Sequence, residues 1–364
     1  MEQSQFIEYI NEFFPGIVIR VVQELNGTAE TPSIYLHRQM LKKEYSVTGK
    51  WETLFGSYSN VMADFVAMDS SLPLKSRDSM GGASGDIPKM GMELWLNEKQ
   101  LTELYTLRAQ GGTKAQIAAK IFEDTPRVIK GPYERNEFMY LQGLSSGVAI
   151  ADTDNTGVGV RMDYKYPTEN KFGASVVWSN PTGAVPIDDL GRVVAKATAD
   201  GNTITTLMMD KTAWNNLIKT TQMKELYGAG IGFGGDYTKI PSLTSNQVKQ
   251  VLQERIGVDT VTIVDFTARY EKNGVKTTVR PWADGAVVAL STTQVGSLVY
   301  ARLAEQDSPV AGVSYETADD FLLVSKFRTN RPALAEFTTS QARVVPVIGN
   351  VDQIYLLDSK TVQA

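Results

Sequence analysis

The chain has 364 residues, of which 42% are hydrophobic and 21% charged, and this ordinary globular composition excludes a disordered or fibrous protein. The absence of cysteine excludes disulfides, thiolate metal sites and a cysteine nucleophile, and the single histidine, His37, excludes histidine-rich metal centres. The formal net charge of −5, without a Lys/Arg run, disfavours both a dedicated nucleic-acid binder and attachment to an anionic membrane.

The longest uncharged runs, Phe138 to Ala151 and Gly285 to Ala301, fall short of the about 20 apolar residues that span a bilayer. The acidic start MEQSQFIEYINEFF lacks the basic and apolar regions of a signal peptide. Together with the missing cysteines, these features predict a protein that is made and folded in a cytoplasm.

The N-terminal residues 1–14 predict a short helix that Pro15-Gly16 ends. Phe6, Tyr9 and Phe13 give this helix more aromatic surface than a free tail carries. The helix therefore either packs on its own domain or forms an arm that packs on a neighbouring subunit, and these three residues are the candidate contacts.

The stretch from Gly56 to Met92 has weak periodicity and a Gly-Gly-Ala-Ser-Gly run, and loops longer than about 12 to 15 residues are usually functional or disordered. It holds five of the twelve methionines, whose flexible side chains suit surfaces that adapt to variable partners. An extended two-stranded interaction arm fits this pattern, with an intramolecular lid and simple disorder as alternatives. The candidate contacts of the arm are Tyr58, Val61, Met62, Phe65, Met68, Leu72, Met80 and Met90.

Two helices are predicted next. Asn97 and Gln100 form a capping-box pattern that opens a helix over 98–109, which Gly111-Gly112 ends. Thr125-Pro126 starts a second and longer helix that continues to about Leu144. Gly131-Pro132 inside it predicts a kink or a restart near Lys130.

The second half of the chain mixes both kinds of element. Alternating residues predict strands over 158–162 and 174–178, and apolar spacing and caps predict helices over 187–197, 210–217 and 244–256. Asn273-Gly274 predicts a hairpin with a type I′ turn. The runs FLLVSKF, ALAEFTTS and ARVVPVI predict further strands, so the fold class is α+β.

Motifs that would indicate an enzyme fail on context. Gly230-x-Gly232-x-x-Gly235 matches the dinucleotide fingerprint in letters, but a helical segment instead of a strand precedes it. Residues 152–157 imitate a calcium loop without its terminal glutamate, so a tight turn explains them. His37 is expected to be a packed or solvent-facing residue, and the adjacent acids at 188–189 and 319–320 diverge in direction. We therefore predict no catalytic residue, no metal site and no cofactor.

Several tracts, taken in order, resemble one family. They are IPKMGMELWLNEKQL at 87–101, the Thr125-Pro126 helix, WSNPTGAVPIDDLGRVV at 178–194, the hairpin tract from Ala268, GSLVYARLAE at 296–305 and the closing RVVPVIGNVDQIYLLD. Together they are similar to major capsid proteins of tailed bacteriophages, most closely the lambda-type major head protein family. This resemblance implies the Hong Kong 97-like phage capsid fold.

The resemblance implies an N-terminal arm at 1–44 and an extended loop at 45–96. A peripheral domain with a long spine helix would take residues 97–185 and 300–345, and an axial domain with a mixed sheet residues 186–299 and 346–364. The implied partners are copies of the chain in pentamers and hexamers, a separate scaffolding protein, a portal, a decoration protein and double-stranded DNA held without sequence specificity. An acidic chain suits a DNA container, because a basic lining would grip the DNA. Since no long charged helical segment precedes the arm, we expect a separate scaffolding protein, or a processed precursor, instead of a fused scaffold. No residues match the lysine–asparagine cross-link of some members of the fold, so covalent cross-linking is not predicted.

The sequence-based hypothesis is a subunit that self-assembles into an icosahedral shell in the virion, after synthesis in the bacterial cytoplasm. One alternative is an encapsulin-like cellular compartment on the same fold. A second alternative is an enzyme that uses the glycine loop or paired carboxylates.

Overall fold

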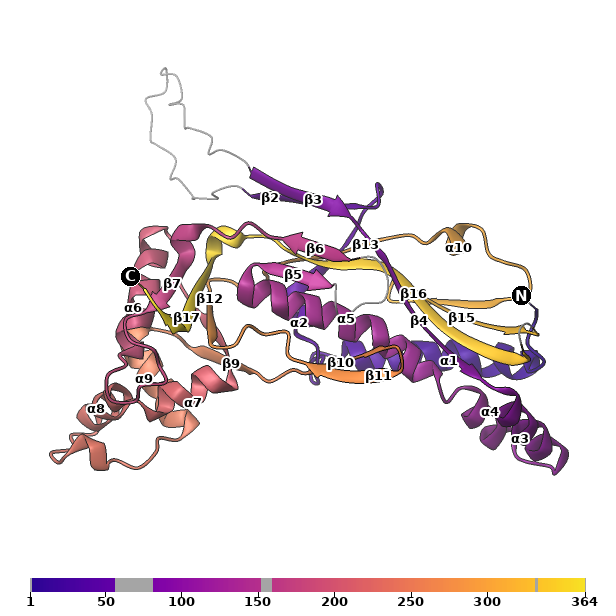
Figure 1. Cartoon of the computed structure of the whole chain (residues 1–364), viewed down its shortest axis with the longest axis horizontal. Helices are drawn as coiled ribbons and strands as arrows, with labels where there is room; N and C mark the ends of the chain where they lie inside the picture. Colours follow the sequence, from indigo (N-terminus) through magenta and orange to yellow (C-terminus); the bar gives the residue numbers. More distant parts are fainter. Residues whose placement is uncertain (1, 56–80, 152–158, 331–332, 364) are drawn as a thin grey trace, which may run out of the picture. The chain divides into compact units, whose positions relative to one another are not determined.

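The computed structural model describes residues 2–55, 81–151, 159–330 and 333–363, and its contacts divide the chain into two compact units (Figure 1). The first unit comprises residues 1–51, 84–140 and 296–347, and the second comprises 52–83, 141–295 and 348–364. The division differs from the sequence-based domain map chiefly at residues 141–185, which cluster with the second unit.

The first unit combines helices with a long sheet. Its helices are α1 (Ile7–Asn26), α2 (Leu36–Met40), α3 (Glu98–Ala109), α4 (Lys114–Ile121), the greater part of α5 (Thr125–Ser146) and α10 (Ala304–Asp307). Its strands are β1 (Leu41–Tyr45), β4 (Lys89–Leu96), β13 (Gly296–Ala301), β14 (Ser314–Ala318), β15 (Leu322–Thr329) and nearly all of β16 (Ala335–Ile348). The strands form one sheet in the order β1-β13-β16-β15-β14, with β4 also paired to β16.

Helix α1 corrects one prediction, because it continues through Pro15 to Asn26 instead of ending at Pro15-Gly16. A proline inside a helix removes one hydrogen bond and costs about 3 kcal/mol. The buried stripe on both sides of Pro15, including Phe14, Val18 and Leu25, supplies enough packing to hold the helix together.

Helix α3 confirms the predicted capping box. The Asn97 side chain accepts a hydrogen bond from the Gln100 backbone at 3.0 Å, and the Gln100 side chain accepts one from the Asn97 backbone at 2.9 Å. The same reciprocal pattern at Thr113 and Gln116 starts α4, a helix that the sequence analysis overlooked. Both boxes satisfy N–H groups that have no partner within their helix.

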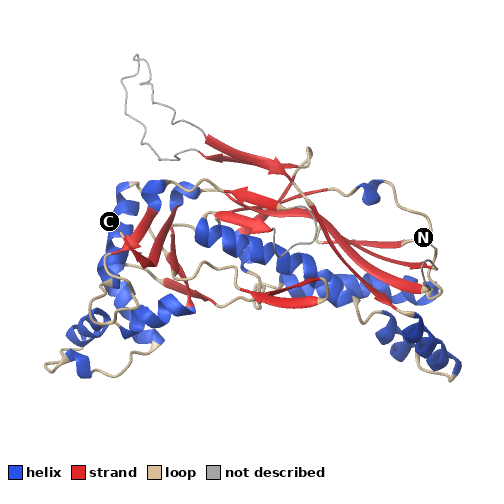
Figure 2. Cartoon of the chain, viewed as in Figure 1, coloured by secondary structure: helices blue, strands red, loops and turns tan. Residues whose placement is uncertain are grey.

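Helix α5 is one element from Thr125 to Ser146, so the helix does not restart at Gly131-Pro132 (Figure 2). Gly131 is in contact with the sheet, since a Cβ there would meet the Met92 sulfur at 3.0 Å. The Ser340 hydroxyl of β16 donates a hydrogen bond to the Val128 carbonyl of the same helix. The glycine and this polar contact therefore let α5 lie close on β4 and β16.

The second unit has a mixed sheet in the order β7-β17-β12-β8-β9, in which β17–β7 and β8–β9 are parallel. The sheet strands are β7 (Lys171–Ala174), β8 (Thr206–Asp210), β9 (Thr260–Val264), β12 (Ala286–Leu290) and β17 (Ile354–Val362). The helices are α6 (Pro186–Ala199), α7 (Lys211–Lys219), α8 (Thr221–Gly230) and α9 (Ser245–Ile256), with 3₁₀ turns η1 (Thr168–Asn170), η2 (Tyr237–Lys239) and η3 (Val351–Gln353). Their apolar faces share one core with the sheet that includes Trp178, Leu190, Met209, Leu217 and Leu252.

Local signals predicted this unit well. Asp210 caps α7 by accepting a hydrogen bond from the Ala213 N–H, and Thr244 with Gln247 caps α9. The second predicted strand was displaced, since the structure places β7 at Lys171–Ala174 and not at 174–178.

Two small two-stranded sheets also belong to the second unit. In the first, β5 (Val148–Ala151) pairs with β6 (Val160–Asp163). In the second, β10 (Ala268–Lys272) and β11 (Val275–Val279) form the predicted hairpin. Its turn residues Asn273 and Gly274 both have positive φ, 54° and 77°, as a type I′ turn requires.

Candidate subunit-contact surfaces

The predicted interaction arm has a two-stranded base. Strands β2 (Lys50–Phe55) and β3 (Gly81–Asp86) form a separate two-stranded sheet, and β3 leads directly into β4. A Cβ on Gly85 would meet the indole of the buried Trp51 at 2.8 Å, so glycine allows the two strands to lie flat against each other. The two-stranded form predicted for the arm is thus present in its described part.

One arginine ties the base of the arm to the long sheet. Arg343 of β16 donates hydrogen bonds to the carbonyl oxygens of Gly49 at 3.4 Å, Ile87 at 3.4 Å and Arg302 at 3.3 Å. Gly49 has a positive φ of 71°, and a Cβ there would approach the guanidinium to 2.6 Å. The planar five-donor group of arginine suits such a three-way contact.

Most of the candidate arm contacts lie outside the described residues. These are Tyr58, Val61, Met62, Phe65, Met68, Leu72 and Met80. Met90 is described, and it lies half-buried in β4 opposite Ala342 of β16. Met90 therefore belongs to the sheet of its own chain, next to the base of the arm.

The three N-terminal aromatic residues have different surroundings. Phe6 is 1% exposed and stacks on Tyr105 at 5.5 Å between ring centroids, so its own chain already covers it. Tyr9 and Phe13 are half-buried and stack on each other at 6.5 Å. Only Tyr9 and Phe13 thus retain surface that a neighbouring subunit can reach.

The residues before α1 are fixed to the sheet by buried polar groups. Glu2 exchanges backbone hydrogen bonds of 2.9 and 3.0 Å with Arg328, and the Ser4 hydroxyl donates to the Glu336 carboxylate at 2.9 Å. Burial raises the pKa of Glu336 and lowers the pKa of the nearby Lys326 to about 8. Lys326 donates to the Ile121 carbonyl at 2.9 Å and to the Thr338 hydroxyl at 2.7 Å.

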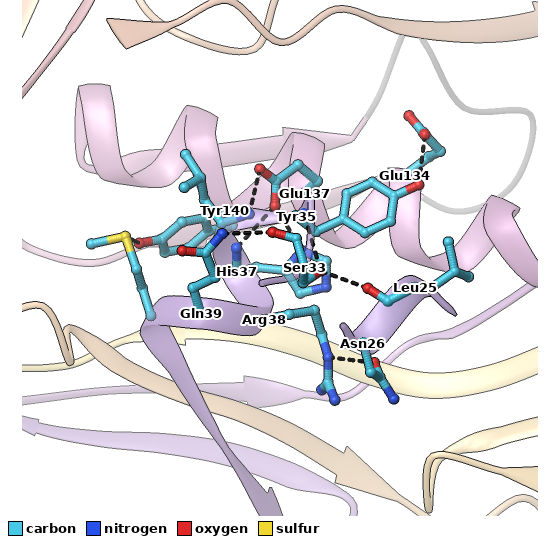
Figure 3. Close-up of polar contacts among 12 residues, drawn as sticks. Leu25, Asn26, Ser33, Tyr35, His37, Arg38, Gln39, Glu134, Glu137 and Tyr140 are labelled. Carbon is cyan, nitrogen blue, oxygen red and sulfur yellow. Dashed lines mark hydrogen bonds and ion pairs between the residues drawn. The ribbon is translucent and has the colours of Figure 1, made fainter. Parts of the chain in front are cut away.

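A second polar cluster joins the segment after α1 to α5 (Figure 3). The carboxylate of Glu137 accepts hydrogen bonds from the Leu36 and His37 backbone N–H groups at 3.0 and 2.9 Å and lies 2.7 Å from His37 Nδ1. The Tyr35 hydroxyl donates to Glu134 at 2.8 Å. His37 is fully buried, and desolvation lowers its pKa, which confirms the packed alternative predicted for this histidine.

Asp319 is the hub of a third cluster. Its side chain, 3% exposed, accepts hydrogen bonds from Asn26 at 3.1 Å, Arg38 at 3.1 Å, Lys43 at 3.2 Å and Tyr133 at 2.6 Å. These four donors come from the end of α1, from α2, from β1 and from α5. One carboxylate therefore holds the N-terminal segment and α5 together.

In each of the adjacent acid pairs 188–189 and 319–320, one aspartate has a buried carboxylate that side chains of its own chain bind. Asp189 is buried and accepts hydrogen bonds from Ser175, Trp178 and Arg192, whereas its neighbour Asp188 is exposed. Asp319 and Asp320 differ in exposure, but they do not diverge as predicted, because both carboxylates bind the Lys43 ammonium. The lysine occupies the space between these two carboxylates, and the 188–189 pair has only one buried member.

The glycine motif Gly230-x-Gly232-x-x-Gly235 follows a helix instead of a strand, as the sequence analysis predicted. Helix α8 precedes it and the turn η2 follows it, so no strand–helix junction is available for a dinucleotide. The imitation of a calcium loop at 152–157 falls outside the described residues. Within the described ranges, no group of three or more His, Cys, Asp or Glu side chains is placed to hold a metal ion. No described helix is long and apolar enough to cross a membrane.

Sequence reasoning missed the residues that anchor these surfaces, namely Arg343, Asp319, Glu137 and Lys326. Most of their contacts join residues 100 or more positions apart, such as His37 with Glu137 or Gly49 with Arg343. No local spacing signals such pairs. For α4 the signal was present, because Thr113 and Gln116 repeat the capping pattern that revealed α3.

Two solved structures with a similar arrangement are a prophage protein and a phage-related protein. A putative capsid protein of a prophage from E. coli CFT073 superposes with a TM-score of 0.54 at 13% identity, covering 98% of this chain and 99% of that one. A phage-related protein from Bordetella bronchiseptica RB50 gives 0.50 at 14% identity, covering 94% and 97%. The fold is therefore the α+β fold of phage capsid proteins, as the predicted Hong Kong 97-like class requires.

A family model makes the assignment specific. The model described as phage major capsid protein E matches residues 86–326, which is more than half of the chain. This chain belongs to that family, and it is a structural component of the phage virion rather than an enzyme. Capsid shell proteins assemble from many copies of themselves. A search of curated proteins finds no significant match.

Proposed function

We propose that the chain forms an icosahedral shell of pentamers and hexamers around the double-stranded DNA of a tailed bacteriophage. The family match carries this proposal, and the anchored two-stranded arm supports it. An arm fixed at its base by Arg343 can reach a neighbouring subunit while its own domain stays folded. Assembly takes place in the host cytoplasm, with a separate scaffolding protein, a portal and a decoration protein as partners.

The arm contacts a neighbour through Tyr58, Val61, Met62, Phe65, Met68, Leu72 and Met80, with Met90 at its base. The N-terminal contact is made by Tyr9 and Phe13, because Phe6 is covered by its own chain. Flexible methionines allow one sequence to meet neighbours at the different angles of pentamers and hexamers. Residues 1–44 act as the N-terminal arm and 45–96 as the extended loop. The peripheral domain comprises 97–185 and 300–345, and the axial domain 186–299 and 346–364.

Replacing residues 56–80 with a short Gly-Ser turn tests the arm. This replacement keeps β2 and β3, so the subunit is expected to stay folded and soluble while it loses the ability to form shells. Electron microscopy and sedimentation of the protein, co-expressed with its neighbouring genes, give the readout. Shells of normal size and yield from this variant would refute the role of the arm, and a wild-type chain that never assembles would refute the proposed function.

A further inference from the structure

One exposed face of α1, called the outer face here, carries two glutamates and, near the middle of the helix, a glycine that no other part of the chain covers. Residues 1–30 contain five glutamates and one arginine. Glu8, Glu12, Gly16 and Ile19 follow one another along this face at helical spacing and are all exposed, Ile19 by 46%. The face therefore offers negative charge on one side of a small apolar patch.

Gly16 is unusual within this face. It lies in the interior of the helix, and no other described side chain or backbone atom lies within 4 Å of the place where its Cβ would be. Glycine in a helix interior costs about 0.5 to 1 kcal/mol relative to alanine. No described atom of the chain fills the space beside Gly16, so another molecule can approach the helix closely at this position.

The hairpin β10–β11 has the opposite charge. Residues 268–280 contain four cationic residues and one carboxylate within a chain of net charge −5. The strand register puts Arg269 opposite Thr278 and Glu271 opposite Lys276, all exposed on one face, and Arg280 continues that face. At the tip, Val275 is 65% exposed. A two-stranded hairpin is at best marginally stable alone, which favours its coverage by a partner.

We propose that the hairpin β10–β11 of one copy docks on the outer face of α1 in a neighbouring copy. Arg269 and Lys276 meet Glu8 and Glu12, and the exposed turn Asn273-Gly274 reaches the bare patch at Gly16 and Ile19. Charge complementarity favours a second copy of this chain over nucleic acid, because the cations then meet carboxylates that every copy carries. This inference rests on the proposed function and adds a pair of contacting surfaces to it.

The two surfaces are different patches of the same chain, so the contact is head-to-tail. Head-to-tail contacts generate rings when the rotation between copies closes. Such a contact thus suits rings of five and six copies. Both patches already contain ion pairs, Lys114–Glu12 at 3.1 Å and Lys276–Glu271 at 3.8 Å. These pairs are exposed and weak, so docking can replace them.

Charge reversal tests the contact. Glu8→Lys/Glu12→Lys and, separately, Arg269→Glu/Lys276→Glu are each expected to lower the yield of shells about tenfold, as like charges then face each other. The four-residue combination is expected to restore the yield, because the pairs are opposite again. Lys249→Glu on the exposed surface of α9 is the control for altered charge. Circular dichroism and urea unfolding of each variant confirm that the subunit is folded.

A cross-link gives an independent readout. The chain has no cysteine, so Gly16→Cys with Asn273→Cys introduces the only two thiols. Oxidised shells are expected to give a ladder of covalent oligomers on a non-reducing gel, whereas Ile34→Cys with Asn273→Cys gives monomers. A monomeric band from the cysteine pair that includes Gly16→Cys would overturn the contact. So would a normal yield of shells from both charge-reversal variants under conditions in which the wild type assembles. Retention of a DNA fragment by the wild type but not by the hairpin variant, with normal shells from both, would assign the hairpin to nucleic acid and overturn it too.

Discussion

The interiors of the two units differ in chemistry. In the first, His37, Glu137, Lys326 and Glu336 are all at most 3% exposed, and Asp319 holds four donors. In the second, one continuous apolar cluster fills the space between the sheet and α6, α7 and α9, and the buried acids are Asp189, which Arg192 binds, and the helix cap Asp210. Buried charges require fixed partners, whereas an apolar core tolerates changes of similar volume. The first unit should therefore respond to pH and to single polar substitutions, and the second to changes in volume.

The largest expected effect is at Asp319. Asp319→Ala removes the carboxylate that pairs with the almost buried Arg38 and accepts from the Tyr133 hydroxyl, and breaking such a buried pair costs about 3 to 5 kcal/mol. Urea unfolding, carried out in the variant whose residues 56–80 are replaced with a Gly-Ser turn so that the subunit stays unassembled, measures the loss in the free energy of unfolding. Asp320→Ala is the matched control, because both aspartates have positive φ, 53° and 70°, but Asp320 is mostly exposed. Equal losses from both variants would show that the positive φ, and not the hydrogen bonds of Asp319, determines the loss of stability.

In the second unit, Leu252→Ala is expected to lower the free energy of unfolding by about 2 to 5 kcal/mol, since Leu252 is fully buried in the apolar cluster. The loss should be the same at pH 6 and pH 8, as no titratable group takes part. Leu252→Met, which keeps the volume, should cost under about 1.5 kcal/mol. A loss that changes strongly with pH would contradict the contrast between the two interiors.

Lys326 should make the first unit more stable at moderately alkaline pH. Its pKa is about 8 in the folded chain and near 10.5 when unfolded, so the unfolded chain binds more protons between these values and stability rises with pH. Urea midpoints at pH 7.5 and about 9, one unit below the ordinary tyrosine pKa of about 10, measure the rise. Lys326→Met is expected to abolish it. A rise that persists in this variant would assign it to another group.

His37 should stay neutral at pH values where an exposed histidine is charged. Desolvation lowers its pKa below 6.5, and because the unfolded histidine takes up its proton first, this group reduces stability as the pH falls through 6.5. As the chain has one histidine, its imidazole signal in an NMR titration is unambiguous. An apparent pKa at or above 6.5 in the folded subunit would contradict the assignment.

The smallest effect is expected at Gly16. Gly16→Ala should stabilise the isolated subunit by up to about 1 kcal/mol while lowering the yield of shells, because the methyl group fills the proposed docking patch. Gly191→Ala in α6 is the control, since a Cβ there also meets no described atom within 4 Å. It should stabilise the subunit equally and leave assembly unchanged. Normal assembly of Gly16→Ala would weaken the role of α1.

Sequence reasoning succeeded where a signal is local. Asp210 at the start of α7 and Asn273-Gly274 in the hairpin each determine their structure through neighbours within four positions. The ordered tracts also identified the class of protein, which the family match over residues 86–326 confirms.

It failed where distant contacts outweigh local preference. Pro15 predicts the end of a helix, yet packing of Phe14 on Phe122, whose ring centroid is 6.1 Å away, helps α1 to continue. The acid at 319 looked like half of an adjacent pair, and only the fold brings Asn26 and Tyr133 to it. Asn26 and Tyr133 lie 186 or more positions away from Asp319 in the sequence, and no pattern in one sequence encodes such contacts.

The anchor at Arg343 also determines how the arm bears load. Strand β3 continues into β4, which is paired antiparallel with β16 from Glu336 to Arg343. A pull along β4 therefore acts parallel to this ladder and strains all of its hydrogen bonds at once, while Arg343 binds the chain on both sides of the arm, at Gly49 and Ile87. Hydrogen bonds loaded together withstand more force than bonds opened one by one. The junction therefore has the geometry of a shear joint, which resists the separation of β4 from β16.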